Sequence, residues 1–187
     1  ETNDVFREIC PQGRLIEPGR HLGHHRAVDL MYSHVGTPYI FHCEDDWCFN
    51  RTDFLQDAMA VLQADTKISS VHFRATKDIP LEELDRDRVT CDTKGGFPIE
   101  RMTYVHAQWY GFSFNPHLSE KLLWENLGKF SQFKKERHIS RILRSQGRYM
   151  AFLMPEACRH IGGEHSTTKQ KMKLTRQLKN WLRQTLP

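Results

Sequence analysis

Residues 38–49, with the sequence PYIFHCEDDWCF, decide the fold and pose a problem of charge. The first half is a compact apolar run that predicts a strand covered on both faces, as in parallel sheets. The second half places three carboxylates, Glu44, Asp45 and Asp46, directly after that strand. Neighbouring anions repel one another, and burying them without a counter-charge is costly. The sequence therefore predicts that a metal ion, a cluster of Lys and Arg, or water surrounds these side chains.

Outside this stretch, segments with the apolar spacing of helices alternate with short apolar runs typical of strands. Helices are predicted at residues 4–10, 23–35, 50–65, 120–127 and 136–147, the fourth of them capped by Ser119. Strands are predicted at residues 13–18, 38–43, 68–75, 103–114 and 149–155, and a long polar loop with small elements at residues 76–102. Such alternation indicates an α/β fold built around one sheet.

The composition is that of a single globular domain. The chain has 187 residues, of which 39% are hydrophobic and 27% are charged, which excludes the disordered and fibrous classes. It contains no run of about 18 apolar residues, so no membrane-spanning helix is predicted. The five Cys form no C-x-x-C pair, which indicates neither a disulfide framework nor a zinc ribbon, and a reducing cytoplasm is expected.

Positive charge is concentrated at the C-terminal end. The net charge is +4, and the last twenty residues carry six Lys or Arg and no acid. Residues 166–187 are therefore predicted to form a basic helix, which either packs on the domain or lies on an anionic membrane surface. We expect a cytoplasmic protein, with peripheral contact at the inner face of a membrane as the alternative.

The spacing of the three acids favours a cation site. On a strand, residues two apart share a face, so Glu44 and Asp46 point the same way and Asp45 points away. Ligands of open α/β sheets bind at the carboxyl ends of strands, where these acids lie. Oxygen ligands suit Mg²⁺ or Mn²⁺, which bind through one or two carboxylates together with substrate phosphates. The alternative is a solvated strand end next to a helix N-terminus, whose dipole stabilises the acids.

Residues 21–49, HLGHHRAVDLMYSHVGTPYIFHCEDDWCF, resemble the central segment of GT-A-type glycosyltransferases, particularly the family-2-like bacterial and viral members. In that family a Gly-led helix precedes an apolar strand and an acidic D-x-D-like motif, which here is residues 44–46. The resemblance implies one GT-A-like domain over residues 1–187, with a mostly parallel sheet sandwiched by helices and a Rossmann-like architecture for a nucleotide sugar.

The resemblance also implies roles for individual residues. Asp46 and Glu44 would bind Mn²⁺ or Mg²⁺, and Glu44 or Asp45 would contact the nucleotide-diphosphate sugar. Gly23, which leads the helix, would lie near the nucleotide. For residues 158–166, CRHIGGEHS, the resemblance implies a loop histidine that reaches the metal or the diphosphate. His160 is the first choice for this role and His165 the second.

Two further segments resemble the acceptor side of the family's site. Residues 109–120, WYGFSFNPHLSE, are similar to the strand that lines it, and residues 134–147 are similar to the helix that carries the catalytic base of inverting members. Glu136 is the matching position, where a carboxylate can take the proton of an acceptor hydroxyl. Its basic neighbours and the helix N-terminus are expected to lower its pKa. The alternative is a surface Glu in the first turn of a helix.

The predicted function is a metal-dependent transfer of a sugar, with inversion, from a nucleotide diphosphate to a hydroxyl of a glycan or lipid-linked acceptor. No nucleic-acid partner is expected, and an oligomer is left open. Two alternatives remain: a metal-dependent phosphoesterase or nuclease, in which the acids hold two ions, and a non-catalytic module whose basic C-terminal helix binds anions. The strand–helix–strand unit with which GT-A domains begin is expected to be missing from residues 1–187.

Overall fold

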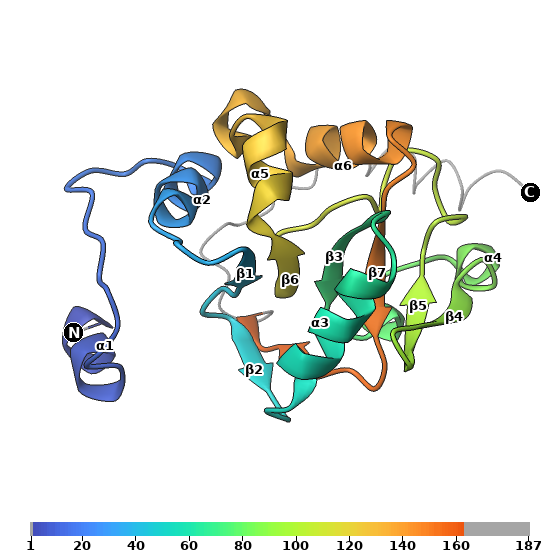
Figure 1. Cartoon of the computed structure of the whole chain (residues 1–187), viewed down its shortest axis with the longest axis horizontal. Coiled ribbons are helices and arrows are strands. Elements are labelled where there is room, and N and C mark those ends of the chain that lie inside the picture. Colours follow the sequence, from blue (N-terminus) through green and yellow to red (C-terminus); the bar gives the residue numbers. More distant parts are fainter. Residues whose placement is uncertain (1, 163–187) are drawn as a thin grey trace, which may run out of the picture.

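The computed structural model describes residues 2–162 (Figure 1). The basic helix predicted for residues 166–187 and the second-choice His165 lie outside the described residues. The helices are α1 (Thr2–Ile9), α2 (His24–Ser33), α3 (Phe54–Ala64), α4 (Glu83–Arg86), α5 (Lys121–Leu127) and α6 (Glu136–Ser145), with 3₁₀ turns η1 (Thr76–Asp78) and η2 (Phe130–Gln132). The strands are β1 (Tyr39–His42), β2 (Trp47–Phe49), β3 (Ile68–His72), β4 (Thr90–Lys94), β5 (Phe97–Arg101), β6 (His117–Glu120), β7 (Tyr149–Leu153) and β8 (Cys158–His160).

Six strands form one sheet in the order β1-β6-β3-β7-β5-β4, and β2 pairs with β8 in a separate two-stranded sheet. The general α/β class is confirmed, but the predicted mostly parallel sheet is wrong. Only β3 and β7 pair in parallel, whereas the other four neighbouring pairs are antiparallel. Two strands cause the difference. β5 follows β4 through a tight turn, which forces an antiparallel pair, and β6 is inserted in reverse between β1 and β3.

The direction of the strands nevertheless defines one functional edge. β1 and β3 are both antiparallel to β6, so they run in the same direction, and β7 is parallel to β3. The carboxyl ends of β1, β3 and β7 therefore lie at the same edge of the sheet, and the reversed β6 begins there.

Helices cover both faces of this sheet (Figure 1). Neighbouring residues of β1 point to opposite faces, as in any strand. Ile40 packs with residues of α2, α5 and α6, whereas Tyr39 packs against the core formed by α3, β3 and β7. The prediction that this strand is covered on both faces is wrong at Phe41, which is 40% exposed.

Buried Asp29 fixes the position of α2 against α5 and η2. Its Oδ1 accepts hydrogen bonds from Trp124 Nε1 and the Phe130 N–H, and its Oδ2 accepts one from the Ser131 N–H, all at 2.8 Å. Burial alone would raise the pKa of Asp29, but these hydrogen bonds outweigh it and lower the pKa. The carboxylate stays ionised and holds α2, whose first residue is His24, in place.

Several predicted elements are confirmed, among them the strands now called β1, β3 and β7 and the helices now called α1, α2, α3 and α6. The strand predicted at residues 13–18 is wrong, since no strand forms there. The strand predicted at residues 103–114 is also wrong. Its aromatic side chains reach the core from an irregular segment whose Gly111 N–H donates to Ser140 Oγ rather than to a neighbouring strand. The predicted cap Ser119 lies inside β6, and Glu120 precedes α5 instead.

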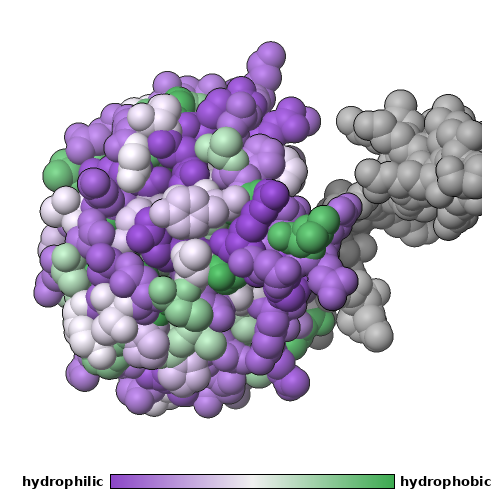
Figure 2. Space-filling view, turned by 90° about the vertical axis from the view of Figure 1, so that its right-hand side faces the viewer, coloured by the Kyte–Doolittle hydropathy of each residue, from purple (hydrophilic) through white to green (hydrophobic). Residues whose placement is uncertain are grey.

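The outer face beyond β4 and β5 is mostly hydrophilic, with hydrophobic side chains scattered over it (Figure 2). Within residues 2–162, no helix is both long and apolar enough to cross a bilayer.

Three buried histidines form a row across the sheet, one from each of β1, β6 and β3. His42 lies opposite His117, and His117 lies opposite His72. The ring centroids are 5.2 Å apart for the first pair and 5.3 Å for the second, and the exposed fractions are 4% or less. Burial lowers the pKa of His42 to about 4 and that of His72 to about 3, and it places the pKa of His117 well below its ordinary value. The row is therefore neutral at pH 7.

The histidine row makes the protein sensitive to acid. An unfolded histidine has a pKa of about 6.5, so the unfolded chain binds more protons than the folded chain as the pH falls below that value. At pH values below about 6.5, each histidine of the row therefore lowers the free energy of unfolding by about 1.4 kcal/mol for every unit by which the pH falls. Replacing His42 by Gln should reduce this slope by that amount between about pH 6 and pH 5, as measured by urea unfolding at a series of pH values.

The matched control for this measurement is His34→Gln, because His34 is exposed. The control should leave the slope unchanged. An unchanged slope in His42→Gln would contradict the neutral state of the row.

Candidate functional site

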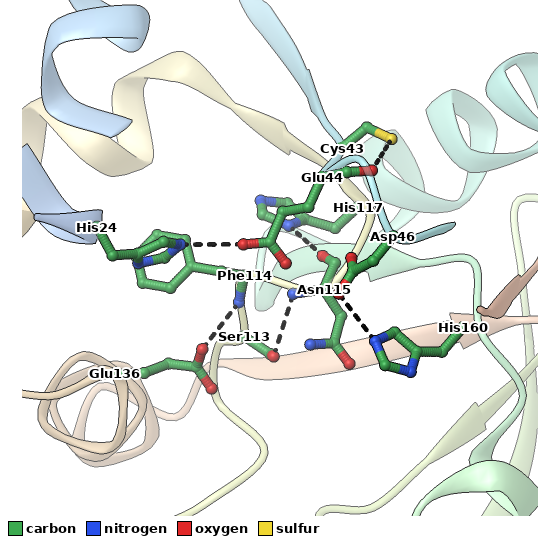
Figure 3. Close-up of polar contacts among 10 residues, drawn as sticks. All are labelled: His24, Cys43, Glu44, Asp46, Ser113, Phe114, Asn115, His117, Glu136 and His160. Carbon is green, nitrogen blue, oxygen red and sulfur yellow. Dashed lines mark hydrogen bonds and ion pairs between the residues drawn. The ribbon is translucent and has the colours of Figure 1, made fainter. Parts of the chain in front are cut away.

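The three acids lie in the turn between β1 and β2, at the edge where β1, β3 and β7 end (Figure 3). Glu44 and Asp46 are half-buried and Asp45 is exposed. Glu44 and Asp46 do not point the same way, because Glu44 turns toward His24 and Asp46 toward His160 (Figure 3). The backbone differs from the prediction, because strand β2 follows the acids directly where a helix was expected. The helix that follows the acids in the sequence, α3, begins only at Phe54.

The two-stranded sheet brings His160 to Asp46. The register of β2 and β8 places Trp47 opposite His160, and the Ile161 N–H donates to the Asp46 carbonyl oxygen at 2.9 Å. His160 Nε2 lies 2.9 Å from Asp46 Oδ2 (Figure 3). A Cβ added at Gly162 would lie only 2.8 Å from Asp46 Cβ, so the chain after β8 closes over this carboxylate. Asp46 and His160 are thus brought together by the register in which β2 pairs with β8.

Glu44 is held by His24, the first residue of α2. His24 Nε2 lies 3.1 Å from Glu44 Oε1. The hydrogen bond to Glu44 raises the pKa of His24, although partial burial opposes the shift. Gly23 precedes this helix with φ of 75°, a conformation that favours glycine. Its role is therefore to turn the chain into α2, and it does not line the cavity beside the acids.

Two cavities adjoin these residues. The acid cavity, of about 300 Å³, is lined by the three acids with His24, His42 and Cys43 among others. The Glu136 cavity, of about 290 Å³, is lined by Glu136 together with Arg74, Asn115, Trp109 and His72 among others. The charges of Glu44 and, more weakly, of Glu136 both act to raise the pKa of His24.

Glu136 points inward from the first turn of α6 (Figure 3). Its Oε2 accepts a hydrogen bond of 3.1 Å from the Phe114 N–H. Burial raises the pKa of Glu136, while the Phe114 N–H, the Ser113 hydroxyl and His24 oppose the shift. The expected lowering of this pKa by the basic neighbours Lys134, Lys135 and Arg137 is wrong. The carboxylate is turned away from solvent, where its neighbours in the sequence have little effect on it.

The acid cavity fits a cation that needs few protein ligands. Asp46 Oδ1 is buried without a hydrogen-bond partner, while Oδ2 faces His160. Glu44 is paired with His24, so the implied set of Asp46, Glu44 and His160 is not assembled. Residues 2–162 contain no group of three or more His, Cys, Asp or Glu arranged to hold a metal. A Mg²⁺ or Mn²⁺ ion bound through one or two protein ligands and substrate phosphates matches these donors.

Within residues 2–162, no cluster of Lys and Arg forms ion pairs with the acids. Within the described part of the chain, the ion-pair partners of Glu44 and Asp46 are His24 and His160, and no Lys or Arg is paired with either acid. A histidine carries charge only when protonated, so the negative charge of the cavity depends on pH.

Comparison with known proteins gave no match: no family model, no curated protein and no solved structure is similar to the chain.

The sequence analysis missed Arg74 and Asn115, and it assigned no role to His24. Arg74 follows β3 at the same edge as the acids, and its Nη1 donates to Asn115 Oδ1 at 2.7 Å. One signal could have found Arg74, since it is a charged residue one position before the end of the predicted strand 68–75. Nothing in the local sequence marks Asn115.

Removing the Glu44 carboxylate should lower the pKa of His24, because the hydrogen bond and the charge of Glu44 are what raise it. In Glu44→Gln, the His24 resonances should titrate at lower pH than in the wild type when followed by NMR. The exposed Glu83 offers a matched control, and Glu83→Gln should not change the titration. A His24 titration that is the same in all three proteins would show that the contact does not form in solution.

Proposed function

We propose that the chain is a metal-dependent glycosyltransferase that moves a sugar from a nucleotide-diphosphate donor to a hydroxyl of a glycan or lipid-linked acceptor, with inversion. The observation that supports it most directly is the pair of cavities at one edge of the sheet. One cavity carries acids whose partners are histidines, and the other carries a buried carboxyl group. The resemblance of residues 21–49 to GT-A glycosyltransferases supports the same conclusion.

The acid cavity is the proposed donor side. Asp46, with its unpartnered Oδ1, and His160 would hold Mn²⁺ or Mg²⁺. Such an ion, when bound, neutralises the charge of the leaving diphosphate. Glu44 keeps His24 at the cavity wall through their hydrogen bond, and a protonated His24 adds a positive charge where phosphate oxygens would lie.

The Glu136 cavity is the proposed acceptor side. The ionised Glu136 takes the proton of the acceptor hydroxyl as that oxygen forms its bond to the anomeric carbon and the bond to the diphosphate breaks. Attack from the side opposite the leaving group inverts the anomeric centre. The raised pKa of Glu136 makes it a stronger base than an exposed carboxylate, and the Phe114 N–H fixes its orientation.

Asp46→Asn should abolish the binding of nucleotide diphosphates that depends on Mn²⁺, because it removes the charge that binds the cation. Isothermal titration calorimetry with UDP and GDP, each with and without Mn²⁺, measures this directly. The matched control is Asp87→Asn, since Asp87 is exposed at the end of α4. Binding that is absent from the wild type, or that persists unchanged in Asp46→Asn, would contradict the proposal. Phosphate release that requires Asp46 would favour a phosphoesterase instead.

Glu136→Gln should leave Mn²⁺–nucleotide binding intact but reduce transfer by about 10²-fold or more, the range expected for a lost general base. In the wild type the rate should rise with pH through the pKa of Glu136, which burial places above that of an ordinary carboxyl group. The residual rate of the variant should lack this rise, and Glu83→Gln should behave as the wild type. A variant with full activity and an unchanged pH profile would remove Glu136 from the mechanism.

A further inference from the structure

Arg74 places a positive charge in the Glu136 cavity without a carboxylate partner. Its Nη1 donates to Asn115 Oδ1 at 2.7 Å and its Nη2 donates to the Asp78 carbonyl oxygen at 2.8 Å, both of which are neutral acceptors. Its Nε is buried and has no partner. A half-buried guanidinium is normally compensated by an anion, because taking its charge out of water is costly. The Trp47 ring, whose centroid lies 5.3 Å from Arg74 Cζ, adds a cation–π contact but no negative charge. The missing anion is therefore expected from a ligand.

The other charged groups around the cavity do not provide this compensation. Arg137 adds a second positive charge to the lining, and Glu136 is held by the Phe114 N–H. Asp78 acts on Arg74 only at longer range, from the turn η1. Among residues 2–162, neither arginine forms an ion pair.

An exposed aromatic side chain, Trp109, lines the same cavity as Arg74. The Trp109 side chain is 45% exposed and stacks on His106, with ring centroids 4.5 Å apart and planes inclined by 22°. The N–H groups of Gln108 and Trp109 both donate to His106 Nδ1, which fixes the stack. Tyr110 adopts φ of 62°, a strained conformation for a non-glycine residue. The backbone therefore holds a flat, pre-formed ring surface at the cavity.

We infer that the Glu136 cavity binds a sugar ring that carries a negative charge, with Arg74 pairing with its anionic group and Trp109 stacking on the ring. A carboxylate of a uronic acid and a phosphate of a sugar phosphate share this chemistry. The charge-assisted hydrogen bonds of a guanidinium select the anion, and the aromatic face selects the ring. The inference rests on the proposed function in one respect, which is that this ligand is the acceptor.

Binding of small sugars to the wild-type protein tests this without any transfer reaction. Methyl β-D-glucuronide, glucose 6-phosphate and the neutral methyl β-D-glucoside are titrated separately and followed by protein-detected NMR. At least one anionic sugar should bind about tenfold more tightly than the glucoside, as expected for one charge-assisted hydrogen bond. The two anionic sugars distinguish a carboxylate from a phosphate. Equal affinity for all three, or no binding of any, would overturn the inference.

Variants test whether Arg74 causes the preference for anionic sugars and whether Trp109 contributes to the binding of the sugar ring. Arg74→Gln should remove the preference for the anionic sugar, Arg74→Lys should keep part of it, and Trp109→Ala should weaken the charged and neutral sugars alike. Arg88→Gln is the matched control, since Arg88 is exposed and pairs with Asp85 at 3.4 Å. If Arg74→Gln does not fold, Arg74→Lys and the wild-type comparison decide. If Arg74→Gln weakens Mn²⁺–nucleotide binding and leaves the sugar preference intact, Arg74 serves the donor side and the inference is wrong.

The same samples separate this inference from the proposed function. Selective sugar binding without nucleotide binding would support the anionic-sugar site and contradict the glycosyltransferase. Nucleotide binding that depends on Mn²⁺, without a preference for charged sugars, would contradict the inference alone.

Discussion

The shared direction of β1, β3 and β7 is the constraint on which the candidate site depends. Strands that run in the same direction end at the same edge of a sheet. The turn after β1, which contains Glu44, Asp45 and Asp46, therefore lies at the same edge as Arg74, which follows β3. The reversed strand β6 starts at that edge and brings Asn115 and the Phe114 N–H with it. Helices α2 and α6 then supply His24 and Glu136 from the face that Asp29 helps to fix. Residues that line both cavities therefore come from the strands that end or begin at this one edge of the sheet.

The choice of histidine as the partner of each half-buried acid has a chemical consequence. An arginine in the position of His24 or His160 would neutralise the neighbouring carboxylate at every physiological pH and would occupy its oxygens with a rigid fork of donors. A histidine makes a single contact and loses its charge near neutral pH. The carboxylate of Asp46, whose Oδ1 has no hydrogen-bond partner, therefore keeps an oxygen for a cation, which is the property that the proposed donor side requires.

Much of the fold could be predicted from the sequence, because β1, β3 and β7 are apolar runs and α3 and α6 are amphipathic. Prediction failed where local pattern and tertiary structure disagree. The aromatic residues of 103–114 suggested a strand, yet they reach the core from an irregular segment. The strand directions could not be predicted, since they depend on how β6 is inserted between strands that are distant in the sequence.

The candidate site shows the same limit. The acidic triplet pointed to Asp46 and Glu44, and the resemblance to GT-A glycosyltransferases pointed to His160 and Glu136, but neither indicated how these residues pair. Asp46 and His160 are 114 residues apart and meet through the register of two short strands, which leaves no local signal. The pKa of Glu136 was predicted in the wrong direction because its neighbours in the sequence are basic, whereas burial, which only the fold determines, is the larger effect.

The row of neutral histidines extends from one cavity to the other. His42 lines one of them, His72 lines the other, and His117 lies between. Buried, uncharged rings form a region of low dielectric constant that screens poorly, so a charge in one cavity is felt in the other. Burial is the main cause of the raised pKa of Glu136, and the charge of Glu44 adds to it. An occupant that brings net positive charge beside Glu44 would favour the ionised form of Glu136, and one with net negative charge would favour the protonated form. The two compartments thus communicate electrostatically without any movement of the backbone.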